Sequence, residues 1–259
     1  MAEPRTWLLL GASGGIGAAL LDRLLARGDR VLVAQRSEHR WPDHERLIPV
    51  RLDLAAPDLG ARVTALIAER GLPDGLIHCA GVNHFAAAEH NDDDALTAML
   101  DVNLRSALVI TRELLPALRR RGTGTLLFVG STFGSIGFPG YTAYCASKFG
   151  LRGFVEALRR ELADTHLRVR YVAPRATRTA MNEARVEALN HALGNHMDTP
   201  EAVAARLLRA LDGGAASTFL GWPEKLFVRL NALLPFLVDK ALRKQLPTIQ
   251  RFLKPGATP

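Results

Sequence analysis

Short apolar runs alternate with longer amphipathic segments between Thr6 and Leu220. Short runs that end at glycine or polar residues are typical of buried strands, whereas apolar positions repeated every three to four residues indicate helices. The predicted strands are Thr6–Leu10, Arg30–Ala34, Leu47–Leu52, Gly75–His78, Thr125–Val129, Arg168–Ala173 and Ser217–Leu220. Helices are predicted between them, among them Leu59–Arg70, Thr142–Leu162 and Pro200–Leu211. This alternation predicts an α/β fold: a Rossmann-like, doubly wound parallel sheet of about seven strands with helices on both faces.

A glycine-rich turn joins the first strand to the first helix. Gly11, Gly15 and Gly17 let the backbone turn tightly and approach a ligand, and Ser13 and Ile16 lie in the same turn. The free N–H groups and the dipole of a helix N-terminus favour a pyrophosphate at such a turn. A glycine turn between an apolar strand and an amphipathic helix therefore indicates a dinucleotide-binding site.

Two residues after the next strands bear on the cofactor. Arg36 follows the second strand, where an arginine suits the 2′-phosphate of NADP and an acidic residue would suit the ribose of NAD. The alternative is that Arg36 is a solvated loop residue. Asp53 follows the third strand, where its carboxylate can contact the adenine amine. These positions predict NADP(H) as the cofactor.

Tyr144 and Lys148 lie four residues apart near the start of a predicted helix, so their side chains share one helical face. An ammonium beside a phenol lowers the pKa of the phenol, which makes Tyr144 a candidate acid or base. The alternative is a chance motif, with a packed tyrosine and a solvated lysine. Ser131 lies at a strand end thirteen residues earlier. Asn103 lies inside the helix that precedes that strand, where it predicts a local bulge or a bound water.

Composition is that of an ordinary soluble protein, with 48% hydrophobic and 23% charged residues in 259. Cys79 and Cys145 are the only cysteines, which predicts a reducing compartment, no disulfide framework and no metal site. No signal peptide or membrane span is visible, so we expect a cytoplasmic protein, either free or peripheral at the inner face of a membrane.

The net charge of +7 is concentrated in the C-terminal segment, residues 222–259. Apolar residues crowd one broad face of this segment, basic residues flank them, and Pro235 is expected to divide it into two short helices. Such a segment suits contact with an anionic membrane. The alternative is a packed extension that covers the substrate cleft or a subunit interface. A nucleic-acid partner is not expected, because no base-stacking aromatic platform accompanies the charge.

Taken together, these motifs resemble the short-chain dehydrogenase/reductase family over about Thr6 to Leu220. The resemblance implies a tetrad of Asn103, Ser131, Tyr144 and Lys148, in which Tyr144 exchanges a proton with the substrate oxygen and Ser131 positions that oxygen. It implies that Lys148 contacts the nicotinamide ribose and that Asn103 holds a water. It also implies cofactor contacts from the segments that follow two strands, at Ala80, Gly81, Pro174, Thr177 and Thr179.

Three positions depart from the family pattern. His78 and Cys79 occupy positions where the family usually has small or amide residues, and we interpret His78 as structural. Arg175 replaces a glycine; near the expected nicotinamide or substrate pocket it either meets an anion or changes the shape of the pocket, and the alternative is that it points to solvent. Gly14 stands where members that prefer NADP often carry a basic residue, so NADP preference depends mainly on Arg36.

These observations predict a catalytic, NADP-binding domain at residues 1–221 and a basic amphipathic helical extension at residues 222–259. The predicted function is an NADP(H)-dependent oxidoreductase that interconverts a ketone and a secondary alcohol on a lipophilic or acyl-type substrate, such as a 3-oxoacyl group. The alternative is a regulatory or peripheral-membrane protein of the same fold without turnover. The family resemblance implies a homodimer or homotetramer.

Overall fold

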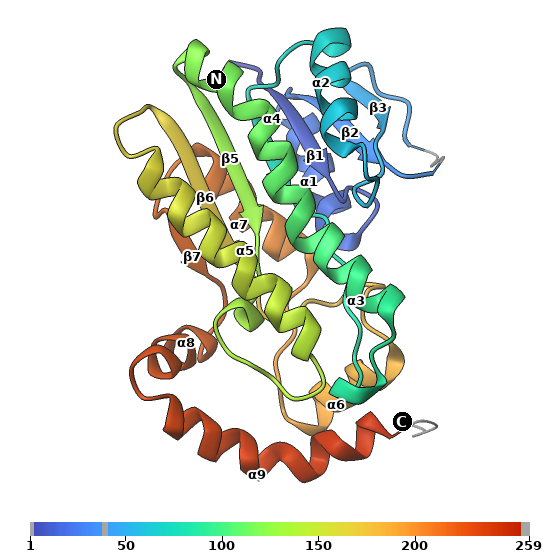
Figure 1. The fold of residues 1–259 in the computed structure, drawn as a ribbon, viewed down its shortest axis with the longest axis vertical. Coiled ribbons are helices and arrows are strands. Elements are labelled where there is room, and N and C mark those ends of the chain that lie inside the picture. Colours follow the sequence, from blue (N-terminus) through green and yellow to red (C-terminus); the bar gives the residue numbers. More distant parts are fainter. Residues whose placement is uncertain (1–2, 38–40, 255–259) are drawn as a thin grey trace.

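The computed structural model describes residues 3–37 and 41–254, and its centre is one parallel sheet (Figure 1). The strands are β1 (Thr6–Leu10), β2 (Arg30–Gln35), β3 (Leu47–Arg51), β4 (Gly75–His78), β5 (Gly124–Val129), β6 (Leu167–Ala173) and β7 (Ser217–Phe219). They form a seven-stranded sheet in the order β3-β2-β1-β4-β5-β6-β7, and every pair is parallel. The predicted fold class is confirmed, with strand bounds within one residue of those expected.

Helices cover both faces of the sheet. They are α1 (Gly15–Ala26), α2 (Leu59–Arg70), α3 (Asp93–Leu100), α4 (Ser106–Arg121), α5 (Thr142–Glu161), α6 (Ala184–Ala192), α7 (Pro200–Asp212), α8 (Glu224–Leu233) and α9 (Pro235–Leu253). Short 3-10 turns at Ala88–His90 and Thr132–Gly134 complete the described chain. The single helix that the sequence predicts around Asn103, before β5, is instead α3 and α4 joined by a π-helical segment, Asp101–Arg105.

The two faces of the sheet bury separate apolar cores. Trp7 and Leu9 of β1 pack with α1 and α7, whereas Leu8 and Leu10 pack with α2, α4 and α5. Successive side chains of a strand point to opposite faces, so a strand buried on both sides must be apolar throughout. That requirement explains why the strands appear in the sequence as unbroken apolar runs.

Strand order reverses direction at β1, which lies between β2 and β4. The turns that leave β1 and β4 therefore run to opposite sides and leave a crevice at the carboxyl ends of the strands. This crevice receives the residues that follow β1, β4, β5 and β6.

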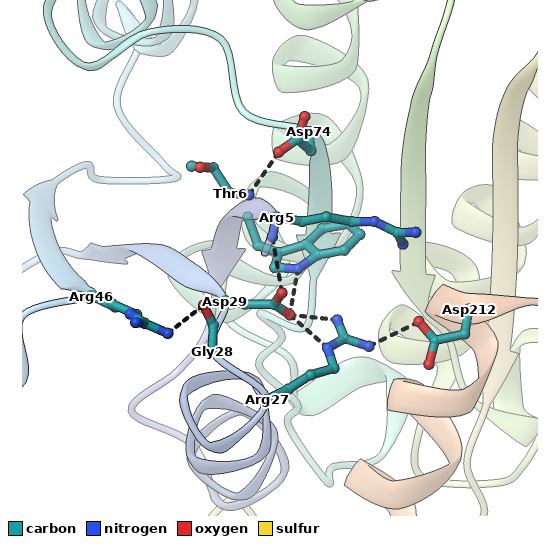
Figure 2. A network of polar contacts seen from close by, with 9 residues as sticks. Arg5, Thr6, Arg27, Gly28, Asp29, Arg46, Asp74 and Asp212 are labelled. Carbon is teal, nitrogen blue, oxygen red and sulfur yellow. Dashed lines mark hydrogen bonds and ion pairs between the residues drawn. The ribbon is translucent and has the colours of Figure 1, made fainter. Parts of the chain in front are cut away.

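The opposite end of the sheet is fixed by the buried carboxylate of Asp29 (Figure 2). It accepts hydrogen bonds from the backbone N–H of Arg5 at 3.0 Å, the indole of Trp7 at 3.0 Å and Nε of Arg27 at 2.8 Å. Arg27 also pairs with Asp212 at the end of α7 at 2.9 Å. Asp29 thus ties the starts of β1 and β2 to α1 and α7, away from the crevice.

A third core lies beyond the carboxyl ends of the strands and includes the C-terminal helices. Phe85, Tyr141, Val186 and Ile249 are buried together, and Phe252 and Leu253 of α9 pack against them. The chain divides at Pro235 as predicted, although α9 is a long helix of 19 residues. The predicted extension, 222–259, includes residues 255–259, which lie outside the described residues. Figure 1 shows α8 and α9 (red) lying across this end of the molecule.

Candidate active site

The glycine turn after β1 is shaped by close backbone contacts. Gly11 has a φ of +81°, and a Cβ there would lie 2.6 Å from the backbone of Ala80. A Cβ on Gly17 would lie 2.1 Å from the carbonyl oxygen of Gly11. No side chain in the described chain caps the N-terminus of α1, and Gly14 to Gly17 line a cavity. Uncapped N–H groups at this position suit the pyrophosphate of a dinucleotide.

Most of the predicted site residues line this cavity, which has a volume of about 450 Å³. They come from the ends of β1, β4, β5 and β6 and from the first turns of α5. They are Gly11, Ser13, Gly15, Ile16, Gly17, Gly81, Ser131, Tyr144, Lys148, Pro174, Thr177 and Thr179. A Cβ on Gly15 would lie 3.1 Å from Cγ2 of Thr179, so the loop after β6 closes directly over the glycine turn.

Four predicted residues lie outside this lining. Ala80 is buried beneath Gly11, and Asn103 is fully buried. Arg36 is exposed directly after β2, and Asp53 is half-buried after β3, where it accepts a hydrogen bond from the backbone of Ala55 at 3.0 Å. Arg36 and Asp53 thus follow neighbouring strands at the same edge of the sheet as the glycine turn.

Asn103 lies in the π-helical segment, so the predicted bulge is confirmed. Its Oδ1 accepts from the backbone N–H of Val82 at 2.8 Å, and its Nδ2 donates to the Val82 carbonyl at 2.9 Å. Nδ2 also donates to Oγ of Ser147 at 3.0 Å. Asn103 therefore fastens the segment after β4 to α5 beside Lys148. Val82 and Ser147 were missed from the sequence, although Ser147 adjoins the motif lysine.

Tyr144 and Lys148 lie close together in α5, as their spacing predicts. The Lys148 ammonium is 5.7 Å from the centroid of the Tyr144 ring and donates to the carbonyl of Val129 at 3.2 Å. Burial lowers the pKa of Lys148 to about 8, because the charged form loses solvation. Lys148 is therefore a buried amine at the carboxyl end of β5, not the solvated lysine of the alternative interpretation.

Burial raises the pKa of Tyr144, and a hydrogen bond with Ser131 acts in the opposite direction without overcoming it. The expected lowering of the Tyr144 pKa by Lys148 is therefore wrong. Spacing along a helix predicts that two side chains meet, but it does not predict how much solvation each loses. The phenol is the stable form of Tyr144 at neutral pH.

Ser131 is held by the turn that follows β5. Its Oγ accepts from the backbone N–H of Phe133 at 3.1 Å and caps the short 3-10 turn. Because that bond occupies one lone pair, the hydroxyl keeps its proton and its other lone pair available toward Tyr144. Ser131 and Tyr144 both line the cavity, where their side chains interact.

His78 is structural, as interpreted from the sequence. Ser106 donates to the carbonyl of Val102 at 2.8 Å, so its oxygen accepts from Nε2 of His78 at 2.7 Å. The ring is fully buried, and burial lowers its pKa to about 3. This chain of contacts satisfies a carbonyl of the π-helical segment and so supports the position of Asn103.

Arg175 does not point to solvent: it joins three segments at the cavity wall. Nη2 contacts Asp198 at 2.7 Å, and Nη1 contacts Glu224 at 3.4 Å and the carbonyl of Trp222 at 3.3 Å. These carboxylates raise the pKa of Arg175, with the Asp198 contact as the main cause. Arg175 therefore ties the loop after β6 to the start of α8, and its charge is compensated within the protein.

The other end of the cavity is mainly apolar, although Asn190, Asn195, His196 and Gln245 also line it. Its lining comes from the loop after β5, from α6, and from both C-terminal helices. The residues are Phe133, Ile136, Phe138, Tyr141, Val186, Leu189, Leu193, Phe227, Val238, Ala241 and Leu242. Of the alternatives for the extension, the structure thus shows α8 and α9 covering this cavity. The expectation that apolar residues crowd one face of the extension is wrong, because Leu233 and Phe236 are exposed whereas Val238 and Leu242 line the cavity; the sequence therefore did not indicate which residues line it.

No helix in residues 3–37 and 41–254 is long and apolar enough to cross a membrane. The same residues contain no cluster of three or more histidine, cysteine or acidic side chains that could hold a metal ion.

Comparison with known proteins places the site in a family. The model of the short chain dehydrogenase family matches residues 5–190. An uncharacterized oxidoreductase from Myxococcus xanthus is 31% identical over 253 residues, covering 93% of this chain and 97% of its own length. The 3-oxoacyl-(acyl-carrier-protein) reductase FabG of Salmonella typhimurium is 29% identical over 188 residues, covering 70% of this chain and 77% of its own.

Among solved structures, a short chain dehydrogenase from Burkholderia cenocepacia in complex with NADP superposes with a TM-score of 0.80 at 26% identity. The match covers 93% of this chain and 98% of that structure. The family match and the superposition agree with the seven-stranded parallel sheet described above. The chain is therefore an oxidoreductase of the short-chain dehydrogenase/reductase family.

Proposed function

We propose that this protein uses NADP(H) to interconvert a ketone and a secondary alcohol on a lipophilic or acyl-type substrate. The observation that carries the proposal is the position of Tyr144. Its hydroxyl meets Ser131 at the junction between the glycine-lined end and the apolar end of one cavity. A substrate carbonyl at that junction has a proton donor beside it and the nicotinamide site on one side.

The bound nicotinamide would supply or accept the hydride, and the chain's own residues handle the proton and the geometry. Tyr144 is protonated at neutral pH because burial raises its pKa, so it is ready to donate to a carbonyl oxygen. Ser131 holds that oxygen beside the phenol. Lys148, with a pKa of about 8, passes between charged and neutral forms near physiological pH and can replace the proton.

Asn103 acts as a positioning residue in this proposal, because its three hydrogen bonds lock the π-helical segment against Val82 and Ser147. The water that the family resemblance assigns to Asn103 remains a prediction. We also propose that residues 180–199 form a lid over the substrate, to which α6 contributes the apolar residues Val186 and Leu189.

NADP(H) is favoured over NAD(H) by Arg36. It is exposed after β2, and it has no ion-pair partner in the described part of the chain, so its guanidinium is available for a 2′-phosphate. The complex of the Burkholderia relative with NADP supports the same choice. Asp53 would contact the adenine, and Pro174, Thr177 and Thr179 would contact the nicotinamide end.

A lipophilic substrate is favoured by the charges of the cavity as well as by its apolar lining. Its charged lining residues are Lys148, Arg175 and Glu224, and Arg175 is already paired with Glu224 and Asp198. The apolar end therefore offers no uncompensated cation for an anionic substrate group within the described residues. The name of the relative that reduces 3-oxoacyl groups is consistent with an acyl-type substrate.

We also propose a homodimer or homotetramer that works in the cytoplasm. Leu100, Leu108 and Phe149 are exposed apolar side chains on α3, α4 and α5, which lie on one side of the molecule (Figure 1). A second copy of the chain would bury them. Sedimentation velocity over a range of protein concentrations tests this part of the proposal.

Tyr144→Phe tests the chemistry because it removes only the hydroxyl. We expect kcat for a long-chain ketone to fall by roughly a thousandfold, since general acid catalysis is worth about a hundredfold to ten-thousandfold. The Kd for NADPH, followed by fluorescence, is expected to stay within about twofold. Retained turnover would refute the assignment of Tyr144. NADPH binding by the wild type without turnover of any ketone or alcohol in a broad panel would favour the regulatory alternative.

Arg36→Leu tests the cofactor preference. The lost contact with the 2′-phosphate is expected to weaken NADPH binding about tenfold and to leave NADH binding unchanged. Arg120→Leu, at an exposed position on α4, is the matched control and is expected to change neither. Wild-type binding of NADH as tight as NADPH would contradict the preference.

A further inference from the structure

The outer side of the α8–α9 pair carries an apolar tip. The tip consists of Leu226 and Leu233 of α8, Leu234 at the turn, and Phe236 and Leu237 of α9. Leu233 is 79% exposed, Phe236 62% and Leu226 50%, so these side chains are not packed on the protein. Exposed large apolar side chains gathered at one turn are unusual on a monomer and mark a contact site.

A basic stripe continues from this tip along α9. Lys240, Arg243 and Lys244 follow Phe236 at intervals of four, seven and eight residues, which places all four on one helical face. Arg251 extends the stripe, and Lys225 and Arg229 flank the tip on α8. None of these basic residues forms an ion pair with another residue of the described chain, and Asp239 is the exposed acidic residue beside them.

The opposite face of the same helices belongs to the substrate cavity. Val238 and Leu242 line it, and Ile249 further along α9 is completely buried in the third core. The helices are thus fixed to the protein by one face, and they present the tip and the stripe on the other. Figure 1 shows α9 lying across the end of the molecule, with its length open to the surroundings on the outer side.

We propose that the tip and the stripe form a docking surface for an anionic lipid membrane. An interfacial helix buries an apolar face at the level of the headgroups and places lysine and arginine against anionic lipid. A second copy of the chain fits this surface less well, because a two-fold contact would bring the two basic stripes together. The docked protein would hold the α8–α9 wall of its cavity against the bilayer, where a lipophilic ketone is dissolved. This last step depends on the proposed function; the docking itself does not.

Co-sedimentation with vesicles tests the docking with full-length protein. Wild-type protein is expected to bind vesicles of phosphatidylcholine mixed with phosphatidylserine, and to bind vesicles of phosphatidylcholine alone much more weakly. The triple variant Lys240→Glu, Arg243→Glu, Lys244→Glu is expected to lose about a hundredfold in partitioning, since each basic residue near an anionic surface contributes about fivefold. The double variant Leu233→Asp, Phe236→Asp is expected to lose binding as well.

The matched control reverses three exposed arginines elsewhere, Arg120, Arg206 and Arg209, each to Glu. It changes the net charge by the same amount and is expected to keep most of the binding, because these residues lie on α4 and α7. Melting temperatures of all variants are expected to stay within a few degrees of the wild type, since the changed side chains are exposed.

Absence of wild-type binding to the anionic vesicles would overturn the proposal, and so would binding that the control abolishes equally. A concentration-dependent dimer that Leu233→Asp, Phe236→Asp dissociates, without vesicle binding, would assign the surface to a second copy instead. Because vesicle binding needs no turnover, it remains interpretable if the proposed reaction fails. Turnover of a water-soluble ketone by the docking variants tests the reaction separately.

Discussion

The two ends of the cavity differ in whether main chain or side chains form the wall. At the glycine end the wall is main chain, held by contacts such as that between Gly11 and the backbone of Ala80. At the apolar end the wall is side chains from the loop after β5, from α6 and from α8 and α9. The glycine end fits a cofactor that is the same in every reaction, whereas the side chains of the apolar end can differ from one substrate to another.

The difference has an energetic basis. A backbone wall tolerates no added atom, because neither partner of the contact can rotate away. A wall of leucine and phenylalanine side chains on helices can accept another apolar residue at a cost of about 1–3 kcal/mol, and similar volumes at less. Substitutions at the glycine end should therefore affect folding and cofactor binding together, and those at the apolar end should affect substrate choice without changing cofactor binding.

Gly17→Ala is the strongest test of the glycine end. Its Cβ would lie 2.1 Å from the carbonyl oxygen of Gly11, and only a backbone shift can relieve that contact. We expect a loss of about 3 kcal/mol in the free energy of unfolding, which lowers Tm by roughly 6–12 °C for a chain of this size.

Gly14→Ala is the control three residues away. A Cβ there would lie 3.5 Å from the same oxygen, in ordinary contact, and Gly14 has a negative φ that any residue adopts. Its Tm is expected to match the wild type within the scatter of surface substitutions. A Gly17→Ala variant as stable as Gly14→Ala would show that the turn adjusts as freely as the apolar wall, and equal destabilisation by both would show that the contact with Gly11 is not the cause.

The glycine end could be predicted because its constraints are local in sequence. A strand, a tight turn and a helix follow one another between Thr6 and Ala26, and helical spacing alone brings Tyr144 and Lys148 together. Ligands of a parallel sheet bind beyond the carboxyl ends of its strands, and Ser131 follows β5 at that edge, so it is expected near Tyr144 and Lys148. Each inference needed only the helical or strand periodicity of the sequence and the direction of the predicted strands.

The apolar end could not be predicted because its contacts join distant segments. Arg175 meets Asp198 and Glu224, and nothing in the sequence around it indicates either partner. The predicted lowering of the Tyr144 pKa was wrong for the same reason, since the burial that raises this pKa comes from residues remote in sequence. Pro235 predicted where the extension bends, but not that Val238 and Leu242 face a cavity.

His78 lies between the two ends, under the π-helical segment, and gives a pH-dependent test. The folded protein holds the ring neutral to a pKa of about 3, whereas the unfolded chain takes up a proton below about 6.5. The unfolded state therefore binds more protons as pH falls below 6.5, so this group destabilises the fold progressively between pH 6.5 and 3. The loss between pH 7.5 and 5 is about 2 kcal/mol by linkage.

His78→Gln removes that titration. Its stability is lower than wild type at pH 7.5, since Ser106 loses a well-placed partner, but its difference from wild type is expected to shrink by about 2 kcal/mol at pH 5. Urea unfolding at the two pH values measures the change. A difference that stays constant with pH would show that the ring is not held neutral and that the π-helical segment is supported in another way.

Leu242→Phe tests the apolar end with the smallest expected effect. Leu242 lines the cavity from α9, so a larger ring there takes space from the substrate without touching the glycine turn. We expect kcat/KM for a long-chain ketone to fall about tenfold, with a short ketone and the Kd for NADPH unchanged. Gln250→Phe, exposed on the same helix and outside the cavity lining, is the control for added bulk.

If long and short ketones lose activity equally, the distortion has reached Tyr144 and the two ends are not independent. If neither loses activity, the chain of the substrate lies away from α9, and the apolar wall has a structural role only.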